Sequence, residues 1–301
     1  MAALAAGALA AAIAACEAGA VTAAPVAAPS EVRTHPIGLV PAVLVCGAAV
    51  LLFGFEQNLL GYAVLAVGLV VAWLVDRSGR TDRLLPDLLL IAIGQVIIST
   101  MPLEADIAYW SMVRFAVVLG LAVAVPYVIS RYWYGDRVIR FPWRTGRRWT
   151  RTQWIYLIAV TVAGWLILPF YFITSGVYEN WPTVTTPDEI ARLFVGVNAV
   201  GTWDELFFIC TVFALLRRHF PTWQANLLQS VVFVSFLWEL GYQSWGPLLT
   251  IPFTLIQGYT FKLTKSLTYV LIVHLIFDAV VFCVIVYAHN GWPAIFPLVP
   301  S

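Results

Sequence analysis

The chain has 301 residues, of which 61% are hydrophobic and 11% are charged, and its formal net charge is +1. A soluble domain of this length could not bury so much apolar surface, so the composition excludes an ordinary globular protein and indicates an integral membrane protein. Its four cysteines, Cys16, Cys46, Cys210 and Cys283, lie singly in apolar stretches, without the spacing of a disulfide framework or a zinc knuckle.

The N-terminal segment, residues 1–36, is rich in alanine and contains Pro25 and Pro29. It lacks the basic start that a secretory signal peptide requires. We therefore expect a poorly ordered leader, with a weakly inserted helix as the alternative.

Nine apolar segments follow the leader, each long enough to be a candidate membrane-spanning helix. Their approximate ranges are 37–54, 58–75, 84–101, 110–130, 153–175, 190–216, 223–241, 246–262 and 267–288. We predict an all-α, polytopic transmembrane bundle of about nine spans. Residues 37–175 form a five-span N-terminal membrane region that would act as an accessory or packing layer. Residues 190–288 form a four-span bundle, and residues 289–301 form a short external tail.

Basic residues are concentrated in alternate loops between these spans. They are Arg77, Arg80 and Arg83 after the second span, seven arginines between 131 and 151 after the fourth, Arg217 and Arg218 after the sixth, and Lys262 and Lys265 before the ninth. Loops rich in Lys and Arg remain in the cytoplasm. We therefore expect a cytoplasmic N-terminus and an external C-terminus, and the Arg-, Ala- and Val-rich usage favours a bacterial plasma membrane.

The arginine-rich loop, residues 131–151, also contains Trp133, Trp143 and Trp149. Basic residues interleaved with aromatic ones resemble a nucleic-acid-binding patch. Because this loop lies between two spans, its residues are better placed to contact anionic lipid headgroups. Membrane lipid is thus an expected partner, and nucleic acid is not.

Four carboxylates and one histidine lie within the last four spans: Asp204, Glu205, Glu239, His274 and Asp278. An ionisable side chain at membrane depth is costly unless it is paired or lines a polar cavity. His274 and Asp278 are four residues apart, so they share one face of a helix. Carboxylates and imidazoles are ordinary ligands of a hydrolytic metal centre. The rival interpretation of the same groups is a proton relay in a transporter.

Neutral polar residues also follow helical spacing in the sixth, seventh and eighth spans. They are Asn198 and Thr202, then Ser235 and Gln243, then Thr250, Thr254 and Gln257. Lipid cannot satisfy their hydrogen-bonding groups, so these faces must meet one another or water. For the Thr and Gln side chains we favour a structural role in a hydrogen-bonded core.

Two stretches resemble motifs of the CAAX-protease and bacteriocin-processing (CPBP, or Abi) family of intramembrane metalloproteases. Residues 204–209, with the sequence DELFFI, resemble the family's EExxFR motif. Residues 274–278, HLIFD, resemble its closing HxxxN motif and follow a turn that ends in Ser266-Leu267. The resemblance covers about residues 190–285 and implies a CPBP-like core in the C-terminal half.

Four positions depart from the family pattern. Asp204 is one methylene shorter than the family's glutamate, Ile209 replaces the arginine, and Asp278 replaces the asparagine. Leu237 stands where the middle motif, FxxxH, has its histidine. Glu239 is the nearby group that could replace this ligand. Because residues two apart on a helix point about 200° apart, the replacement requires a shifted or distorted helix.

The resemblance implies a metalloprotease-like hydrolase that cleaves peptide bonds in or near the membrane, with a membrane-associated peptide or protein as substrate. Asp204 and Glu205 would activate water, while His274, Asp278 and Glu239 would hold a divalent metal. Zinc is the metal of the family, and the oxygen-rich ligand set favours manganese or iron.

Two alternatives remain open. The first is a catalytically degenerate scaffold that holds no metal and serves as an assembly or immunity partner. The missing motif arginine and histidine, at Ile209 and Leu237, favour it. The second is a proton-coupled transporter, against which the absence of an inverted sequence repeat counts.

The catalytic interpretation makes a geometric prediction. Polar atoms of His274, Asp278 and the Asp204–Glu205 pair should lie within roughly 5 Å of a common centre at mid-membrane depth. A separation of more than about 10 Å between His274 and Asp204 would exclude a metal site. Glu239 lies roughly 24 Å along its span from the cytoplasmic end, so it is the group expected to miss the cluster.

Overall fold

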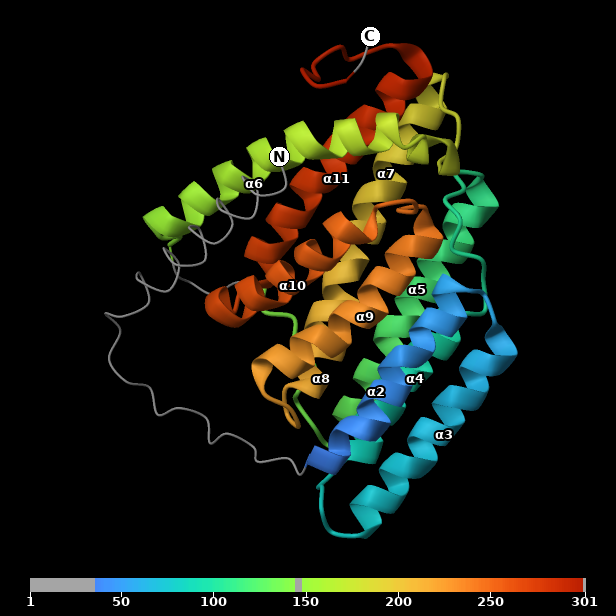
Figure 1. Cartoon of the computed structure of the whole chain (residues 1–301), viewed down its shortest axis with the longest axis vertical. Helices are drawn as coiled ribbons and strands as arrows, with labels where there is room; N and C mark the ends of the chain where they lie inside the picture. Colours follow the sequence, from blue (N-terminus) through green and yellow to red (C-terminus); the bar gives the residue numbers. More distant parts are fainter. Residues whose placement is uncertain (1–35, 144–147, 300–301) are drawn as a thin grey trace.

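The computed structural model describes residues 36–143 and 148–299 (Figure 1). Within these two ranges the chain is helical and contains no strand, which confirms the predicted all-α fold class. Residues 1–35 of the predicted leader lie outside the described residues, as do Arg144 and Arg147 of the arginine-rich loop.

Each of the nine predicted spans coincides with a helix. The helices, in chain order, are α2 (Leu39–Ala49), α3 (Asn58–Arg77), α4 (Leu84–Ile98), α5 (Tyr109–Val128), α6 (Arg151–Thr174), α7 (Pro187–Asp204), α8 (Ala214–Leu216), α9 (Thr222–Leu240), α10 (Pro247–Thr264) and α11 (Leu267–Asn290). The π-helical segments η2 (Val50–Gly54) and η3 (Ile129–Trp133) continue α2 and α5, and a third, η5 (Glu205–Phe213), joins α7 to α8.

In the part of the chain that the structure describes, six helical stretches are long and apolar enough to cross a membrane. They are Pro36–Gly54, Asn58–Arg77, Tyr109–Trp133, Arg151–Thr174, Pro187–Leu216 and Leu267–Asn290. Helix α4 is apolar but has only 15 residues. Helices α9 and α10 do not meet this criterion; α9 carries Ser235, and α10 carries Thr250, Thr254 and Gln257. The predicted membrane helical bundle is confirmed, although six rather than nine segments qualify on their own.

The helices of the N-terminal region lie on two sides of the C-terminal bundle. Helix α2 packs against α3 and α9, and α5 packs against α4 and η5, whereas α6 crosses the other side of the bundle along α11 (Figure 1). Gly164 permits this crossing, because a Cβ atom there would lie 2.8 Å from a ring carbon of Phe277. The N-terminal region therefore encloses the C-terminal bundle from two sides.

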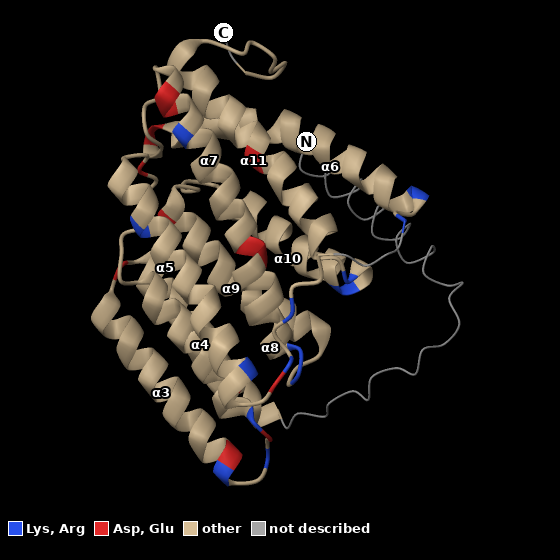
Figure 2. Ribbon diagram, turned by 180° about the vertical axis from the view of Figure 1, so that it is seen from behind, with Lys and Arg blue, Asp and Glu red and all other residues tan. Residues whose placement is uncertain are grey.

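The bundle has two chemically different ends. At one, called the basic end below, the α3–α4 loop and η3 meet the α8–α9 connection, where Arg83, Asp136 and Arg218 form ion pairs (Figure 2). At the other, called the opposite end, the α4–α5 loop meets the start of α7, where the Tyr109 hydroxyl donates to Asp188. Helices α5 and α7 both begin at this opposite end.

An aromatic core fills the C-terminal bundle where η5 contacts α9. Trp203 stacks on Phe207 with ring centroids 5.2 Å apart, and Phe208 stacks on Phe233 at 4.2 Å. All four rings are buried. Since η5 runs from Glu205 toward the basic end, the three phenylalanines lie on the basic-end side of the buried carboxylates.

Candidate functional site

Local sequence signals fix the two helices that carry the buried charges. Thr186 and Glu189 form a capping box at the start of α7, which has Pro187 as its first residue. Lys265 ends α10 with a left-handed backbone, and the Ser266 side chain caps α11. The predicted turn before the HxxxD sequence is thus the tight α10–α11 connection. It places α10 and α11 side by side.

The acidic pair lies where α7 changes into the π-helical segment η5. Asp204 is the last residue of α7, and Glu205 is the first residue of η5. Segments of π-helix occur frequently at functional sites. Neighbouring residues on a helix point about 100° apart. The two carboxylates therefore diverge and lie on different sides of one imidazole ring, that of His274.

His274 brings four of the predicted site residues together, and we call these four the cavity cluster. Its Nδ1 lies 2.8 Å from Glu205 Oε1. Its Nε2 lies 3.6 Å from Asp204 Oδ2 and 3.8 Å from Asp278 Oδ1. All four side chains are buried. These distances are within the roughly 5 Å that the sequence analysis required of the four side chains.

Glu205 is held from behind by Gln257 of α10. The Gln257 Nε2 donates to Glu205 Oε1 at 2.7 Å and to the Val270 carbonyl at 3.1 Å. The sequence analysis placed Gln257 in a structural polar core. The structure shows instead that it contacts the cavity cluster directly. Helical spacing could not reveal this, because Gln257 shares its face with the structural Thr250 and Thr254.

Three carboxylate oxygens of the cavity cluster have no hydrogen-bond partner, although they are buried. They are Asp204 Oδ1, Glu205 Oε2 and Asp278 Oδ2. Leaving a buried polar group unpaired costs about 1–3 kcal/mol, and more for a charged group. Gly201 makes room for one of them, since a Cβ atom there would overlap Asp278 Oδ2. The three unpaired oxygens thus reduce the stability of the fold, so packing alone does not explain this arrangement.

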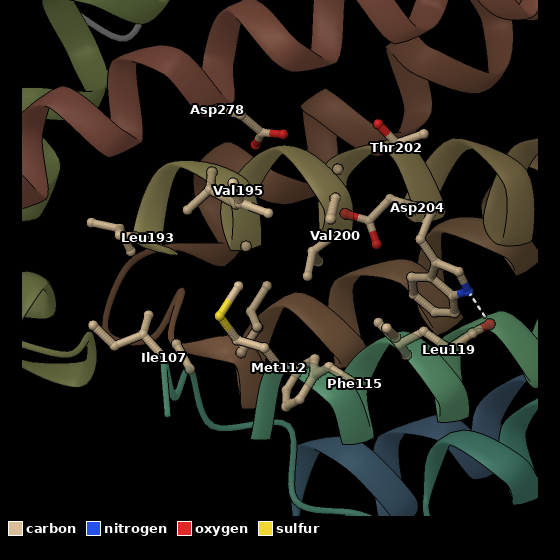
Figure 3. Close-up of a pocket in the computed structure, with 18 of the residues that line it drawn as sticks. Ile107, Met112, Phe115, Leu119, Leu193, Val195, Val200, Thr202, Asp204 and Asp278 are labelled. Atoms are coloured by element: carbon tan, nitrogen blue, oxygen red, sulfur yellow. Dashed lines mark hydrogen bonds between the residues drawn. The ribbon is translucent and has the colours of Figure 1, made fainter. Parts of the chain in front are cut away.

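A cavity of about 380 Å³ reaches the cavity cluster. Asp204, His274 and Asp278 line it, whereas Glu205 lies behind the imidazole and does not. Figure 3 shows both aspartates at one side of the space, from α7 and α11, facing apolar side chains such as Met112 of α5. The cavity therefore combines an apolar chamber with one acidic wall.

Two of the aromatic residues that line this cavity lie outside the predicted spans, and the sequence analysis did not single them out. They are Trp181, which precedes α7, and Tyr242, which follows α9. Their rings lie 5.7 Å apart at right angles, and the buried Trp181 Nε1 has no hydrogen-bond partner. Gly241, with φ of 128°, makes the turn that places Tyr242. Both residues lie outside regular spans, where helical periodicity gives no signal.

The structure does not bring Glu239 to the cavity cluster. Its Oε1 instead accepts a hydrogen bond of 2.9 Å from the Leu103 backbone N–H, in the α4–α5 loop. Helix α9 is regular through this point, so no shift of the helix compensates for the two-residue offset. Leu237, at the position of the family's histidine, lines the cavity. Glu239 thus anchors a loop at the opposite end, which corrects its expected place among the metal ligands.

The imidazole and carboxylates of the cavity cluster are suitable ligands for a divalent metal, but they lie slightly farther apart than the ligands of a bound ion. Across residues 36–143 and 148–299, no three His, Cys, Asp or Glu side chains are arranged to hold one. Two ligands about 2.1 Å from a tetrahedral ion lie about 3.4 Å apart, and His274 Nε2 is 3.6 and 3.8 Å from its two aspartates. The Glu205 contact to Nδ1 matches the carboxylate–histidine pairing typical of metal-binding histidines.

Thr254, one of the predicted polar residues, lies in a hydrogen-bonded contact between α9 and α10. Thr254 accepts through its carbonyl from Gln229 Nε2 at 3.1 Å, and its hydroxyl lies 2.5 Å from that of Ser230. Asn226 donates to the Leu255 carbonyl at 2.7 Å. These bonds join α9 to α10, as we expected of a structural core.

Comparison with known protein families gives a match in the C-terminal part of the chain. Residues 186–280 match the family model of the type II CAAX prenyl endopeptidase Rce1-like proteins. No curated protein and no solved structure matches the chain. The matched segment begins at the N-cap of α7 and ends two residues beyond Asp278, so it contains the whole cavity cluster. Residues 186–280 are therefore similar to the Rce1-like endopeptidases, which agrees with the CPBP resemblance of the motifs.

Proposed function

We propose that the protein is a CPBP-type intramembrane hydrolase that cleaves a peptide bond in or near the membrane. One observation carries the proposal: three buried carboxylates surround a single imidazole, and unpartnered oxygens remain on all three. Neutral polar residues would join the helices at lower cost. The cluster also adjoins a cavity large enough to admit part of a polypeptide.

Within this proposal the carboxylates have unequal roles. Glu205 does not line the cavity, and its contact with Nδ1 orients His274 so that Nε2 points to the cavity side. Asp204 does line the cavity, and its Oδ1 is free to accept a proton from a water molecule. The sequence analysis assigned water activation to Asp204 and Glu205 together. Here Asp204 acts as the base, and Glu205 is a positioning residue.

A divalent metal, if bound, would be held by His274 Nε2 with carboxylate oxygens of Asp204 and Asp278. It would supply a more acidic water nucleophile and a Lewis acid for the scissile carbonyl. Its charge would also offset that of the three carboxylates around His274.

The second candidate function is a catalytically degenerate CPBP scaffold. Two observations favour it. Ile209, at the motif arginine, is fully buried, and Leu237 lines the cavity where the family has a histidine. A scaffold would keep the fold and the cavity, and it would bind a partner without cleaving it.

Comparing the new protein N-termini in membranes of cells that make the wild type or Asp204→Asn separates the two functions. Cleavage predicts a set of termini that depends on Asp204, because removing a general base costs about 100-fold or more in rate. Glu239→Gln is the matched control and should keep these termini, since Glu239 lies outside the cluster. Identical termini in the wild type and Asp204→Asn would favour the scaffold.

A further inference from the structure

We propose that the cavity opens at the opposite end of the bundle, away from the basic end, and that its ligand is an apolar polypeptide segment arriving from that side. The identification of the ligand as a polypeptide rests on the proposed function. The direction in which the cavity opens does not depend on that function and is tested separately.

The residues that line the cavity trace its course from the cluster to the opposite end. Beyond Asp204 the lining reaches Met112 in the first turn of α5. It ends at two loops, with Ala105, Asp106 and Ile107 before α5 and Trp181 and Pro182 before α7. Asp106 is exposed, so the lining extends to the surface at this end.

The route from the cluster to the basic end is closed by packing. After Glu205, the side chains of Phe207, Phe208 and Phe213 are each 0% exposed. On the facing helices, Leu88 of α4 is 1% exposed and Phe233 of α9 is 0% exposed. A close-packed core of this kind leaves no passage for water or a peptide.

The cavity also has an opening along its side, between α5 and α7. Four of its lining residues are exposed at this point, Ala116 and Gly120 on α5 and Val195 and Ala199 on α7. The side chains here are small or absent, and a Cβ atom on Gly120 would meet nothing within 4 Å. A chain lying in the adjoining half of the membrane could therefore enter sideways.

The lining determines the chemical class of the ligand. Figure 3 shows apolar side chains from both walls, including Leu193 and Val195 of α7 and Met112 and Phe115 of α5. Apolar surface of this kind favours an apolar segment over a charged one. Loops rich in Lys and Arg remain in the cytoplasm. The opposite end then faces outward, and the ligand is a polypeptide segment presented on the extracytoplasmic side.

Side-specific thiol labelling tests the direction of opening without any need for turnover. The parent carries Cys16→Ala and Cys283→Ala and retains the fully buried Cys46 and Cys210. Val200→Cys places a thiol in the cavity. Exposed reference positions are Thr183→Cys at the opposite end and Ser78→Cys at the basic end. A charged, membrane-impermeant methanethiosulfonate is added to sealed right-side-out and inverted membrane vesicles.

We expect Val200→Cys to react at least 10-fold faster than the parent, and only in the vesicles in which Thr183→Cys reacts. Reaction in the vesicles in which Ser78→Cys reacts, or in neither kind, would overturn the proposal. Val117→Cys is the matched lipid-facing control, because Val117 is exposed on α5 but does not line the cavity. Labelling of Val117→Cys as fast as Val200→Cys would also overturn it.

A pair of tryptophan substitutions tests the side opening. Ala116→Trp would fill it, whereas Ala124→Trp lies two turns further along the same helix, is exposed and does not line the cavity. We expect Ala116→Trp to reduce Asp204-dependent cleavage at least 10-fold and Ala124→Trp to leave it unchanged. Equal cleavage by both variants would reject entry between α5 and α7.

The two kinds of failure are distinguishable. Adding Asp204→Asn to Val200→Cys removes cleavage under the proposed function and should leave the sidedness of labelling as it was. Labelling from the Thr183 side without Asp204-dependent cleavage would reject the protease and retain the opening. Asp204-dependent cleavage with labelling from the Ser78 side would retain the protease and reject the opening.

Discussion

Two charged clusters in this molecule, one buried and one partly buried, each combine carboxylates with a histidine but differ in how their charges are paired. The cavity cluster joins three carboxylates to one histidine near the middle of the bundle. The second, called the basic-end cluster, consists of Asp87, Asp136, Arg218 and His219. Asp87 Oδ2 lies 2.6 Å from His219 Nε2 and 3.2 Å from an Arg218 nitrogen, which lies 2.5 Å from Asp136.

Pairing is complete in one cluster and incomplete in the other. No buried side-chain nitrogen or oxygen of the basic-end cluster lacks a partner, among the described residues, while each carboxylate of the cavity cluster has one oxygen that does. The paired charges of the basic-end cluster have a structural role, because they join α4, the segment after η3 and the α8–α9 connection. Unpaired buried charges destabilise the fold, so their presence in the cavity cluster requires another explanation. This difference separates a structural site from a functional one.

The largest effect should follow from breaking the cavity cluster. Asp204→Asn is expected to lower the cleavage rate at least 100-fold, measured on a substrate identified from the comparison of new N-termini. The unfolding temperature should stay the same or rise, because the change removes a buried carboxylate that has an unpaired oxygen. Both are measured on the same purified protein. A clear loss of stability would show that the cavity cluster is structural too.

Breaking the basic-end cluster should have the reverse result. Asp87→Ala leaves Arg218 and His219 without their buried partner, which is expected to cost about 3 kcal/mol of stability. Denaturant unfolding in detergent micelles measures this loss in the free energy of unfolding. Asp82→Ala is the control, because it makes the same substitution at an exposed position. Cleavage per folded molecule should not change. If Asp87→Ala unfolds at the wild-type midpoint, pairing does not mark structural charges here.

A smaller effect is expected from closing the space beside Asp278. Gly201→Ala forces a methyl group against Asp278 Oδ2, an overpacking change that typically costs about 1–3 kcal/mol. It should also displace the carboxylate and reduce cleavage. Gly196→Ala is the matched control on the same helix, because a Cβ atom there meets nothing within 4 Å. Unequal cleavage with equal stability would locate the effect in the cavity cluster alone.

The smallest effect concerns the acid sensitivity of the basic end. Burial acts to raise the pKa of Asp136, but the Arg137 backbone N–H and the Arg218 guanidinium outweigh it, so the pKa is lowered from 3.8. A carboxyl whose folded pKa is depressed stabilises the fold above its unfolded pKa and loses that contribution as pH falls through the folded value. Asp136→Asn should therefore flatten the stability profile below about pH 4. An unchanged profile would mean that Asp136 makes no contribution.

The family motifs correctly placed together those residues that are close in sequence. His274 and Asp278 share a helix, and Asp204 and Glu205 are adjacent, so spacing alone placed each pair correctly. The same reasoning failed for Gln257, which has the spacing of its structural neighbours and the contacts of a site residue. Glu239 was included because it lies near a missing histidine in sequence. A regular α9 directs it elsewhere.

The sequence by itself determined the helices, the membrane character and the similarity of residues 186–280 to Rce1-like proteins, because these depend on apolar run length and short-range spacing. Tertiary structure alone decided three further properties. They are the crossing of α6 along α11, the position of Glu205 behind His274, and the course of the cavity toward the opposite end. Each depends on which helix faces meet, and that is set by close packing between residues far apart in the chain, such as Gly164 against Phe277.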